Sequence, residues 1–239
     1  MSKGDCMPKR LVVIPARGGS KRIPKKNIKE FFGKPIISYS LSALEKSKLF
    51  DEIHVSTDDN EILGICSEYG SYCSFLRPKN LSDDHTGILP VLRYVVSEFQ
   101  RQGKVFDQIW LASACAPLLR EEDYKDIANF YDTQVSKKNV TLISEYNVSA
   151  YWALSMDSNN NLSTTFNNVL HERSQDLNAT YFDTGLVAVF DPEMLMKTGE
   201  HIPISDFIGY VAPKNKAFDI DDLDDWEVVK ALYYYLTKN

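Results

Sequence analysis

The sequence has little of what several protein classes require. Its 239 residues include 4 cysteines and 4 histidines, and the formal net charge is −6. No uninterrupted apolar run approaches the roughly 20 residues that a membrane helix needs. No apolar stretch of signal-peptide length follows the N-terminal charges. The acidic balance disfavours a generally basic nucleic-acid binder. We therefore expect a cytoplasmic protein with neither a membrane nor a nucleic acid as its partner.

The few cysteines are scattered, and no two of them form a C-x-x-C pair. This spacing disfavours both a zinc knuckle and a redox dithiol, and it agrees with unpaired thiols in a reducing compartment. The sequence also lacks an internal repeat and a low-complexity linker. Since the length suits one α/β unit, we expect a single domain over residues 1–239.

Strand-like and helix-like segments alternate through the first two thirds of the chain. Short β-branched or apolar runs predict strands, and apolar residues at helical spacing predict helices, the first of which begins with Pro35. The expected strands are 11–15, 52–57, 71–76 and 108–112, and the expected helices are 35–47, 59–69, 88–102 and 121–135. This alternation predicts an α/β fold with a mostly parallel sheet flanked by helices, and a ligand at the carboxyl ends of its strands.

The pattern changes after residue 139. Residues 140–144, 151–156 and 181–190 are strand-like, without comparable helices between them. We therefore expect an insertion over about 145–182, lying over the sheet, and a final helix at 224–238.

The segment after the first expected strand is the strongest chemical signal. It reads I-P-A-R-G-G-S-K-R-I-P-K-K-N over residues 14–27, with five basic residues and no acidic one between Arg17 and Lys26. Gly18 and Gly19 let backbone N–H groups approach an anion, while Arg and Lys side chains neutralise phosphate charge. The segment matches neither the Walker loop nor G-x-G-x-x-G. It predicts a phosphate site, and a solvated basic surface loop is the alternative.

An acidic cluster near the C-terminus complements this loop. Six acidic residues lie between Asp219 and Glu227. On an extended segment, Asp219 and Asp221 point to the same side, so both can reach one Mg²⁺. Asp224 and Asp225 suit the start of the last helix as caps or dipole partners. A capping role for the whole cluster is the alternative.

These motifs together resemble the CMP-sialic acid (acylneuraminate) cytidylyltransferase family. The opening I-P-A-R-G-G-S-K-x-I-P-x-K-N-I is followed by G-K-P-I-I at 33–37, S-T-D-D at 56–59, R-P at 77–78 and L-S-D-D at 81–84. R-S-Q-D-L at 173–177 and D-I-D at 219–221 complete the series. The resemblance covers nearly the whole chain in the expected order.

The resemblance implies a Rossmann-like fold of the nucleotide-diphosphosugar transferase type, with an inserted dimerisation segment. It implies CTP and a nonulosonic acid as substrates, Mg²⁺ as the metal and a homodimer as the assembly. It also implies site residues. The catalytic ones are Lys21, Arg17 and Asp221. The nucleotide-binding ones are Ala16, Arg17, Gly18, Gly19, Ser20, Lys26, Asn27 and Arg77. The sugar-binding ones are Ser113, Arg173 and Gln175, and the metal ligands are Asp219 and Asp221.

One segment departs from the sialic acid enzymes. These usually read Q-P-T-S-P-L-R where this chain has S-A-C-A-P-L-L at 113–119, so Ser113 replaces an amide. This form is more similar to the pseudaminic acid branch. The alternatives are activation of N-acetylneuraminic, legionaminic or ketodeoxyoctonic acid, and a non-catalytic nucleotide sensor. The joint presence of Lys21 and the Asp219/Asp221 pair argues against a sensor.

Overall fold

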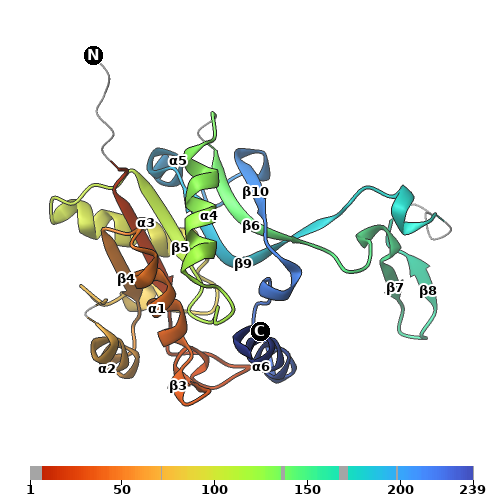
Figure 1. The fold of residues 1–239 in the computed structure, drawn as a ribbon, viewed down its shortest axis with the longest axis horizontal. Coiled ribbons are helices and arrows are strands. Elements are labelled where there is room, and N and C mark those ends of the chain that lie inside the picture. Colours follow the sequence, from red (N-terminus) through yellow and green to blue (C-terminus); the bar gives the residue numbers. More distant parts are fainter. Residues whose placement is uncertain (1–6, 71, 136–137, 167–171, 198, 239) are drawn as a thin grey trace.

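The computed structural model describes residues 7–70, 72–135, 138–166, 172–197 and 199–238. Its centre is a six-stranded sheet with the order β10-β6-β9-β5-β1-β4 (Figure 1). The strands are β1 (Arg10–Pro15), β4 (Glu52–Ser56), β5 (Gln108–Ala112), β6 (Asn139–Glu145), β9 (Tyr181–Phe190) and β10 (Phe207–Val211). β9 runs antiparallel to β5 and β6, and the other pairs are parallel. The predicted α/β fold with a mostly parallel sheet is confirmed.

Helices cover both faces of this sheet. They are α1 (Ile37–Ser47), α2 (Asn60–Tyr69), α3 (Ile88–Arg101), α4 (Glu121–Asp132), α5 (Pro192–Lys197) and α6 (Leu223–Lys238). Residues of α1, α2, α4 and α6 join one hydrophobic cluster, and residues of α3 and α5 join the other. On α3, the apolar stripe runs through Val91, Leu92, Val95, Val96 and Phe99. This spacing is typical of a helix with one buried face.

Strand β1 lies inside the molecule, and its end positions the site. Residues Leu11 to Ile14 are each 0% exposed, with alternate side chains in the two hydrophobic clusters. A strand buried on both faces explains the uninterrupted apolar run. The basic loop therefore begins at the carboxyl edge of a rigid inner strand, as the sequence predicts.

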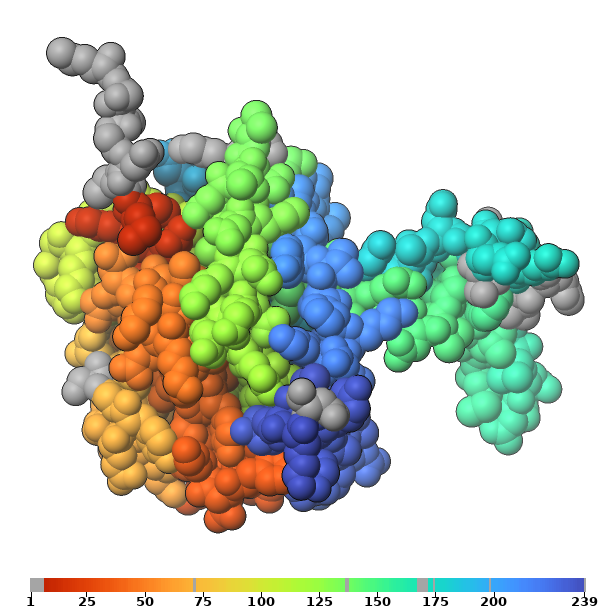
Figure 2. Space-filling view, viewed as in Figure 1, coloured from red at the N-terminus to blue at the C-terminus, as the bar shows by residue number. Residues whose placement is uncertain are grey.

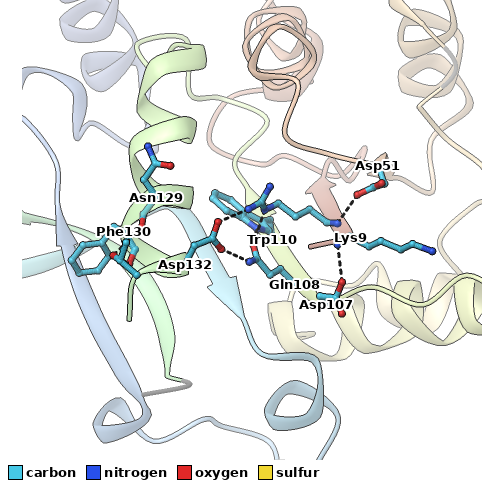
Figure 3. A network of polar contacts seen from close by, with 10 residues as sticks. Lys9, Asp51, Asp107, Gln108, Trp110, Asn129, Phe130 and Asp132 are labelled. Atoms are coloured by element: carbon cyan, nitrogen blue, oxygen red, sulfur yellow. Dashed lines mark hydrogen bonds and ion pairs between the residues drawn. The ribbon is translucent and has the colours of Figure 1, made fainter. Parts of the chain in front are cut away.

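The opposite, amino-terminal edge of the sheet is held by a buried polar network (Figure 3). Arg10 is 4% exposed, and its guanidinium donates to Gln108 Oε1 at 2.9 Å and to Asp132 Oδ2 at 2.6 Å. Gln108 donates to the other oxygen of Asp132 and accepts from the indole N–H of Trp110. The network ties β1 and β5 to the end of α4, on the edge of the sheet away from the site.

Two local expectations were wrong. The described residues 72–76 form no strand, although the carbonyl of Tyr72 accepts a hydrogen bond from Val55 at 2.6 Å. Pro35 does not begin a helix: it belongs to β3 (Lys34–Pro35), which pairs with β2 (Glu30–Phe31), and α1 begins at Ile37. A tight reversal in which Phe32 and Gly33 both have positive φ precedes Pro35, so pairing decided its conformation.

The segment between β6 and β9 projects from the sheet as an arm instead of lying over it (Figures 1 and 2). It carries the hairpin of β7 (Leu154–Met156) and β8 (Leu162–Thr164). Every residue of these two strands is exposed. The hairpin therefore has no hydrophobic core of its own within the described residues.

Candidate functional site

The loop after β1 approaches the loop after β4 so closely that a side chain would not fit at one position. Gly18 N–H donates to Asp58 Oδ1 at 3.2 Å, and a Cβ on Gly18 would lie 2.3 Å from Asp59 Oδ2. Asp59 itself caps α2 through the N–H of Glu61. A Cβ on Gly19 would meet no described atom within 4 Å. Packing therefore explains Gly18, whereas Gly19 leaves its backbone open to a ligand.

Two cations of this loop converge on one carboxylate, Asp84. Arg17 Nη1 lies 2.5 Å from Asp84 Oδ1, and Lys21 Nζ contacts Asp84 Oδ2. Hydrogen bonds from Lys21 and Arg17 lower the pKa of Asp84 to about 2. Its charge keeps the two cationic groups side by side at the mouth of the site. Two cations so placed can also bind the oxygens of a phosphate chain.

The basic loop also reaches the acidic segment at the other end of the chain. Lys26 Nζ donates to the carbonyl of Ile220, and Arg22 Nη2 donates to Asp221 Oδ1 at 2.7 Å. Ile220 is 0% exposed, so its side chain anchors the segment in the core. The two signals that lie nearly 200 residues apart in the sequence therefore form one site.

The two flanking carboxylates differ in their surroundings. Burial raises the pKa of Asp219, Lys26 opposes that shift, and the charge of Asp221 adds to it. The charges of the two aspartates therefore interact, and Asp219 is nevertheless an exposed residue. The start of α6 is capped instead by Asp222, which accepts from the N–H groups of Asp224 and Asp225. The carboxylates of Asp219 and Asp221 are therefore not needed as helix caps.

These two carboxylates fit a Mg²⁺ ion. Mg²⁺ is usually held by one or two carboxylates, with phosphate oxygens and water completing an octahedron. Among the described residues, no group of three or more His, Cys, Asp or Glu side chains is placed to hold a metal alone. A carboxylate with a raised pKa, here Asp219, is stabilised in its charged form by a nearby cation. The donor set suits a metal that arrives with a phosphate ligand.

Two buried side chains form the inner wall. Asn27 donates to the carbonyl of Arg17 at 3.0 Å and is 8% exposed. Arg77 is 6% exposed, and its guanidinium donates to the hydroxyl and the carbonyl of Ser56 at the end of β4. Burial lowers the pKa of Arg77, and Asp58 opposes the shift. Both side chains are fixed by the backbone of the loops that they support.

These groups line one cleft of about 590 Å³. Of the predicted site residues, it brings together Arg17, Ser20, Lys21, Lys26, Asn27, Arg77 and Asp221. Ala16, Gly18 and Gly19 lie in the same loop, and Asp219 is two residues from Asp221. Asp84 and Thr86 also line the cleft, although neither residue was predicted as part of the site. The signal was present, because Asp84 ends the quoted L-S-D-D motif.

The three predicted sugar-binding residues do not line this cleft. Ser113 lies just beyond β5, half-buried, and its hydroxyl accepts from the N–H of Cys115 at 3.2 Å. Arg173 and Gln175 are exposed on the arm, which extends away from the sheet (Figure 1). Within one chain, the structure therefore does not bring the arm residues to the cationic cleft.

Comparison with known proteins gives consistent matches. Residues 11–193 match the family model described as Cytidylyltransferase. The chain is 35% identical to a pseudaminic acid cytidylyltransferase of Campylobacter jejuni, covering 94% of this chain and 96% of that one. It is 29% identical to a CMP-N,N'-diacetyllegionaminic acid synthase of Legionella pneumophila, covering 93% and 95%. A solved CMP:2-keto-3-deoxy-manno-octonic acid synthetase has the same fold, with a TM-score of 0.70, 17% identity and coverage of 95% and 99%.

Proposed function

Because the chain belongs to the cytidylyltransferase family, we propose that it transfers the CMP group of CTP to a nine-carbon acid sugar, preferentially pseudaminic acid. The sugar's anomeric 2-hydroxyl oxygen bonds to the α-phosphorus while the bond to the β-phosphate oxygen breaks. Pyrophosphate leaves, and the hydroxyl proton passes to water. The observation that carries this proposal is the cleft in which the basic loop after β1 meets Asp221.

The cations of the cleft are matched to a triphosphate. Arg17 and Lys26 would bind its oxygens, and the Ala16–Ser20 backbone would cradle it through N–H groups. Lys21 extends into solvent, with 78% of its side chain exposed, and it would meet the α-phosphate. Charge that grows there in the transition state is stabilised by a nearby cation. Asn27 and Arg77, on the inner wall, would contact the ribose and cytosine.

Asp219 and Asp221 would hold Mg²⁺ against this triphosphate. The metal, when bound, neutralises charge on the phosphate oxygens and on the departing pyrophosphate. Ile220, buried between the two carboxylates, fixes the segment that carries them. Lys26 reinforces this position through the Ile220 carbonyl, so a phosphate-binding side chain also orients the metal ligands.

Substrate choice is supported by the identity to pseudaminic acid cytidylyltransferases and by Ser113. Serine is shorter than the glutamine of the sialic acid enzymes and has no amide. A sugar that needs this amide would bury a polar group without a hydrogen-bond partner, and such burial is strongly disfavoured. We expect kcat/KM for pseudaminic acid to exceed that for N-acetylneuraminic acid by at least ~100-fold, equivalent to about 2.7 kcal/mol. Legionaminic acid is the second candidate, because of the 29% identity to a diacetyllegionaminic acid synthase.

Pyrophosphate release from CTP and Mg²⁺ with each of these acid sugars tests the proposal. If none of these acid sugars supports pyrophosphate release, a non-catalytic nucleotide sensor is favoured instead. Equal or better turnover of N-acetylneuraminic acid would overturn the pseudaminic acid assignment alone.

The arm supports a homodimer in which each arm reaches the partner's cleft. Leu154, Met156 and Leu162 lie on one face of the hairpin, since Met156 pairs with Leu162 and side chains alternate along a strand. They are 49%, 66% and 64% exposed, and an isolated hairpin is at best marginally stable. A second copy would cover this face and bring Arg173 and Gln175 to an acceptor.

No helix among the described residues is long and apolar enough to cross a bilayer. We place the reaction in the cytoplasm, where CTP is made.

A further inference from the structure

Cys115 is a buried thiol that has no role in the proposed reaction. It lies in the turn that follows β5, and the residue is 2% exposed. Burial raises the pKa of the Cys115 thiol to about 12, and the nearby charge of Lys26 opposes this shift. The sulfur therefore keeps its proton, and a neutral thiol can donate a hydrogen bond.

Two serine hydroxyls hold the backbone of this turn. The N–H of Cys115 donates to Ser113 Oγ at 3.2 Å. Ser40 of α1, which is 0% exposed, donates to the carbonyl of Ala114 at 3.3 Å and accepts from the N–H of Ala116 at 3.4 Å. The backbone is thus fixed on both sides of Cys115, and the direction in which the thiol points is set by the scaffold.

The thiol reaches the inner wall of the cationic cleft. Cys115 Sγ lies 3.5 Å from Asn27 Oδ1, in a contact that joins residues 88 positions apart in the sequence. At the other end of the same amide, Asn27 Nδ2 donates to the carbonyl of Arg17 at 3.0 Å. The Asn27 amide is therefore held twice, through its oxygen by Cys115 and through its nitrogen by Arg17.

This arrangement decides which group the Asn27 amide offers to the cleft. An amide nitrogen carries two N–H donors, and among the described residues only Arg17 accepts from that of Asn27. Because Asn27 lines the cleft, its second N–H is left for a ligand. Without the thiol proton, Asn27 Oδ1 would be a buried acceptor that lacks a partner, which is unfavourable. The amide would then no longer be held in the orientation that presents a donor.

We propose that Cys115 is a positioning residue for nucleotide binding: its thiol donates to Asn27 Oδ1 and so keeps an Asn27 N–H turned into the cleft, as a donor to an acceptor oxygen of the nucleotide. The inference rests on the proposed function, because that function assigns the nucleotide to the cleft. Cys115 is not one of the residues that line the cleft, so its effect passes through Asn27. Loss of the thiol proton should therefore weaken CTP binding.

Two variants of nearly equal shape isolate the hydrogen-bond donor. Cys115→Thr supplies a hydroxyl donor, and Cys115→Val has a methyl group in its place. Isothermal titration calorimetry with CTP and Mg²⁺ should give a Kd for CTP that is about three- to tenfold higher for Cys115→Val than for Cys115→Thr, as expected for the loss of one hydrogen bond. The measurement uses no acid sugar, so it does not depend on turnover.

Cys66 provides the matched control. It is a thiol of α2 that is 1% exposed, and its side chain makes no hydrogen bond to any of the described residues. Cys66→Val should leave the Kd for CTP unchanged. Thermal melting should show that the variants at both positions fold.

Infrared spectroscopy gives a second readout, which does not require a substitution of Cys115. The S–H stretching band of a thiol moves to lower frequency when the thiol donates a hydrogen bond. CTP should move the Cys115 band of the wild type further in this direction, because an amide that donates to a ligand becomes a stronger acceptor at its oxygen. Asn27→Ala should move the band to higher frequency and abolish the response to CTP. The band of Cys66 should stay unchanged throughout.

The outcomes separate this role of Cys115 from the proposed function. If the wild type does not bind CTP, both are overturned. If the wild type binds CTP, but Cys115→Thr and Cys115→Val bind it equally well, the positioning role alone is overturned. The same holds if neither CTP nor Asn27→Ala moves a thiol band, and this result decides the question where a Cys115 variant fails to fold.

Discussion

Arg22 and Asp221 are 199 residues apart in sequence, and the guanidinium of Arg22 donates to Asp221 Oδ1 at 2.7 Å. One cation of the basic loop therefore contacts a carboxylate that we assign to the metal. The two side chains are 66% and 49% exposed, so the pair is weak, on the order of 0.2–1 kcal/mol. A metal ion bound by Asp221 would compete with Arg22 for this oxygen.

This competition predicts that Arg22→Ala tightens divalent metal binding to the free protein up to about fivefold, because the competing cation is removed. Titration with Mn²⁺, followed by electron paramagnetic resonance, measures this directly. Lys25→Ala is the matched control, since Lys25 lies in the same loop but pairs with Glu61. Asp221→Ala should abolish both Mn²⁺ binding and nearly all turnover while the protein still folds. Undiminished Mn²⁺ binding in that variant would remove the metal assignment.

Lys21 and Arg17 should differ kinetically although both contact Asp84. Lys21→Ala should lower kcat more than it weakens CTP binding, because the assigned role of Lys21 is to stabilise charge in the transition state. Arg17→Ala should chiefly raise KM for CTP. Steady-state kinetics of both variants, with Lys25→Ala as the control, separate the effect on kcat from the effect on KM. A pure KM effect at Lys21 would limit that residue to ground-state binding.

The burial of His54 predicts that the protein loses stability as the pH falls. The residue is 0% exposed on β4, its ring stacks on Phe75 with centroids 4.3 Å apart, and neither ring nitrogen has a hydrogen-bond partner among the described residues. Burial, together with the charge of Arg77, lowers the pKa of His54 to about 4 from 6.5. The unfolded chain therefore binds a proton first as the pH falls.

The stability that depends on a neutral His54 is fully present above pH 6.5. As the pH falls from 6.5 towards 4, the free energy of unfolding decreases by about 1.4 kcal/mol per pH unit. Urea denaturation should therefore give a lower free energy of unfolding at pH 5 than at pH 7.5. His54→Leu should reduce this difference and leave stability at pH 7.5 nearly unchanged. An equal difference in wild type and variant would assign the acid sensitivity to other groups.

The polar network of Arg10 and Asp132 should matter for stability and not for turnover. Asp132→Ala leaves the 4% exposed Arg10 without its carboxylate, which should cost about 2–3 kcal/mol in unfolding free energy. Glu227→Ala, which breaks the exposed pair with Lys230, should cost less than about 1 kcal/mol. Denaturant unfolding gives both values. A kcat changed by Asp132→Ala in folded protein would contradict the placement of this network away from the site.

If each arm reaches the partner's cleft, every active site contains residues of two chains. Met156→Glu should turn a dimer into a monomer in analytical ultracentrifugation, whereas Ser155→Glu, on the opposite face of the hairpin, should not. Lys21→Ala and Arg173→Ala should each lower turnover strongly. Mixing the two variants should restore activity, because one cleft of each mixed dimer would be intact. No recovery in a mixture shown to exchange subunits would place Arg173 outside the partner's cleft.

Local features of the sequence determined most of the fold. The buried run from Leu11 to Ile14, the apolar stripe of α3 and the strand β5 follow from periodicities that the chain carries within a few residues. The basic loop after β1 was also visible in the sequence, because its glycines and clustered cations lie within ten residues, and its phosphate role stays a prediction. Alternation around Ile220, which is buried, predicts that Asp219 and Asp221 lie on one side.

The tertiary structure decided what depends on distant partners. Asp84 became the bridge between Arg17 and Lys21 only because the loop before α3 folds back over the loop after β1. Pro35 was decided more locally, because it pairs with Glu30 across a tight turn instead of beginning the helix. The periodicity of apolar residues indicates which face of a helix or strand is buried. It carries no information about which loops meet at the end of a sheet. The way these loops meet depends on the packing of the whole chain, and it creates the cationic cleft.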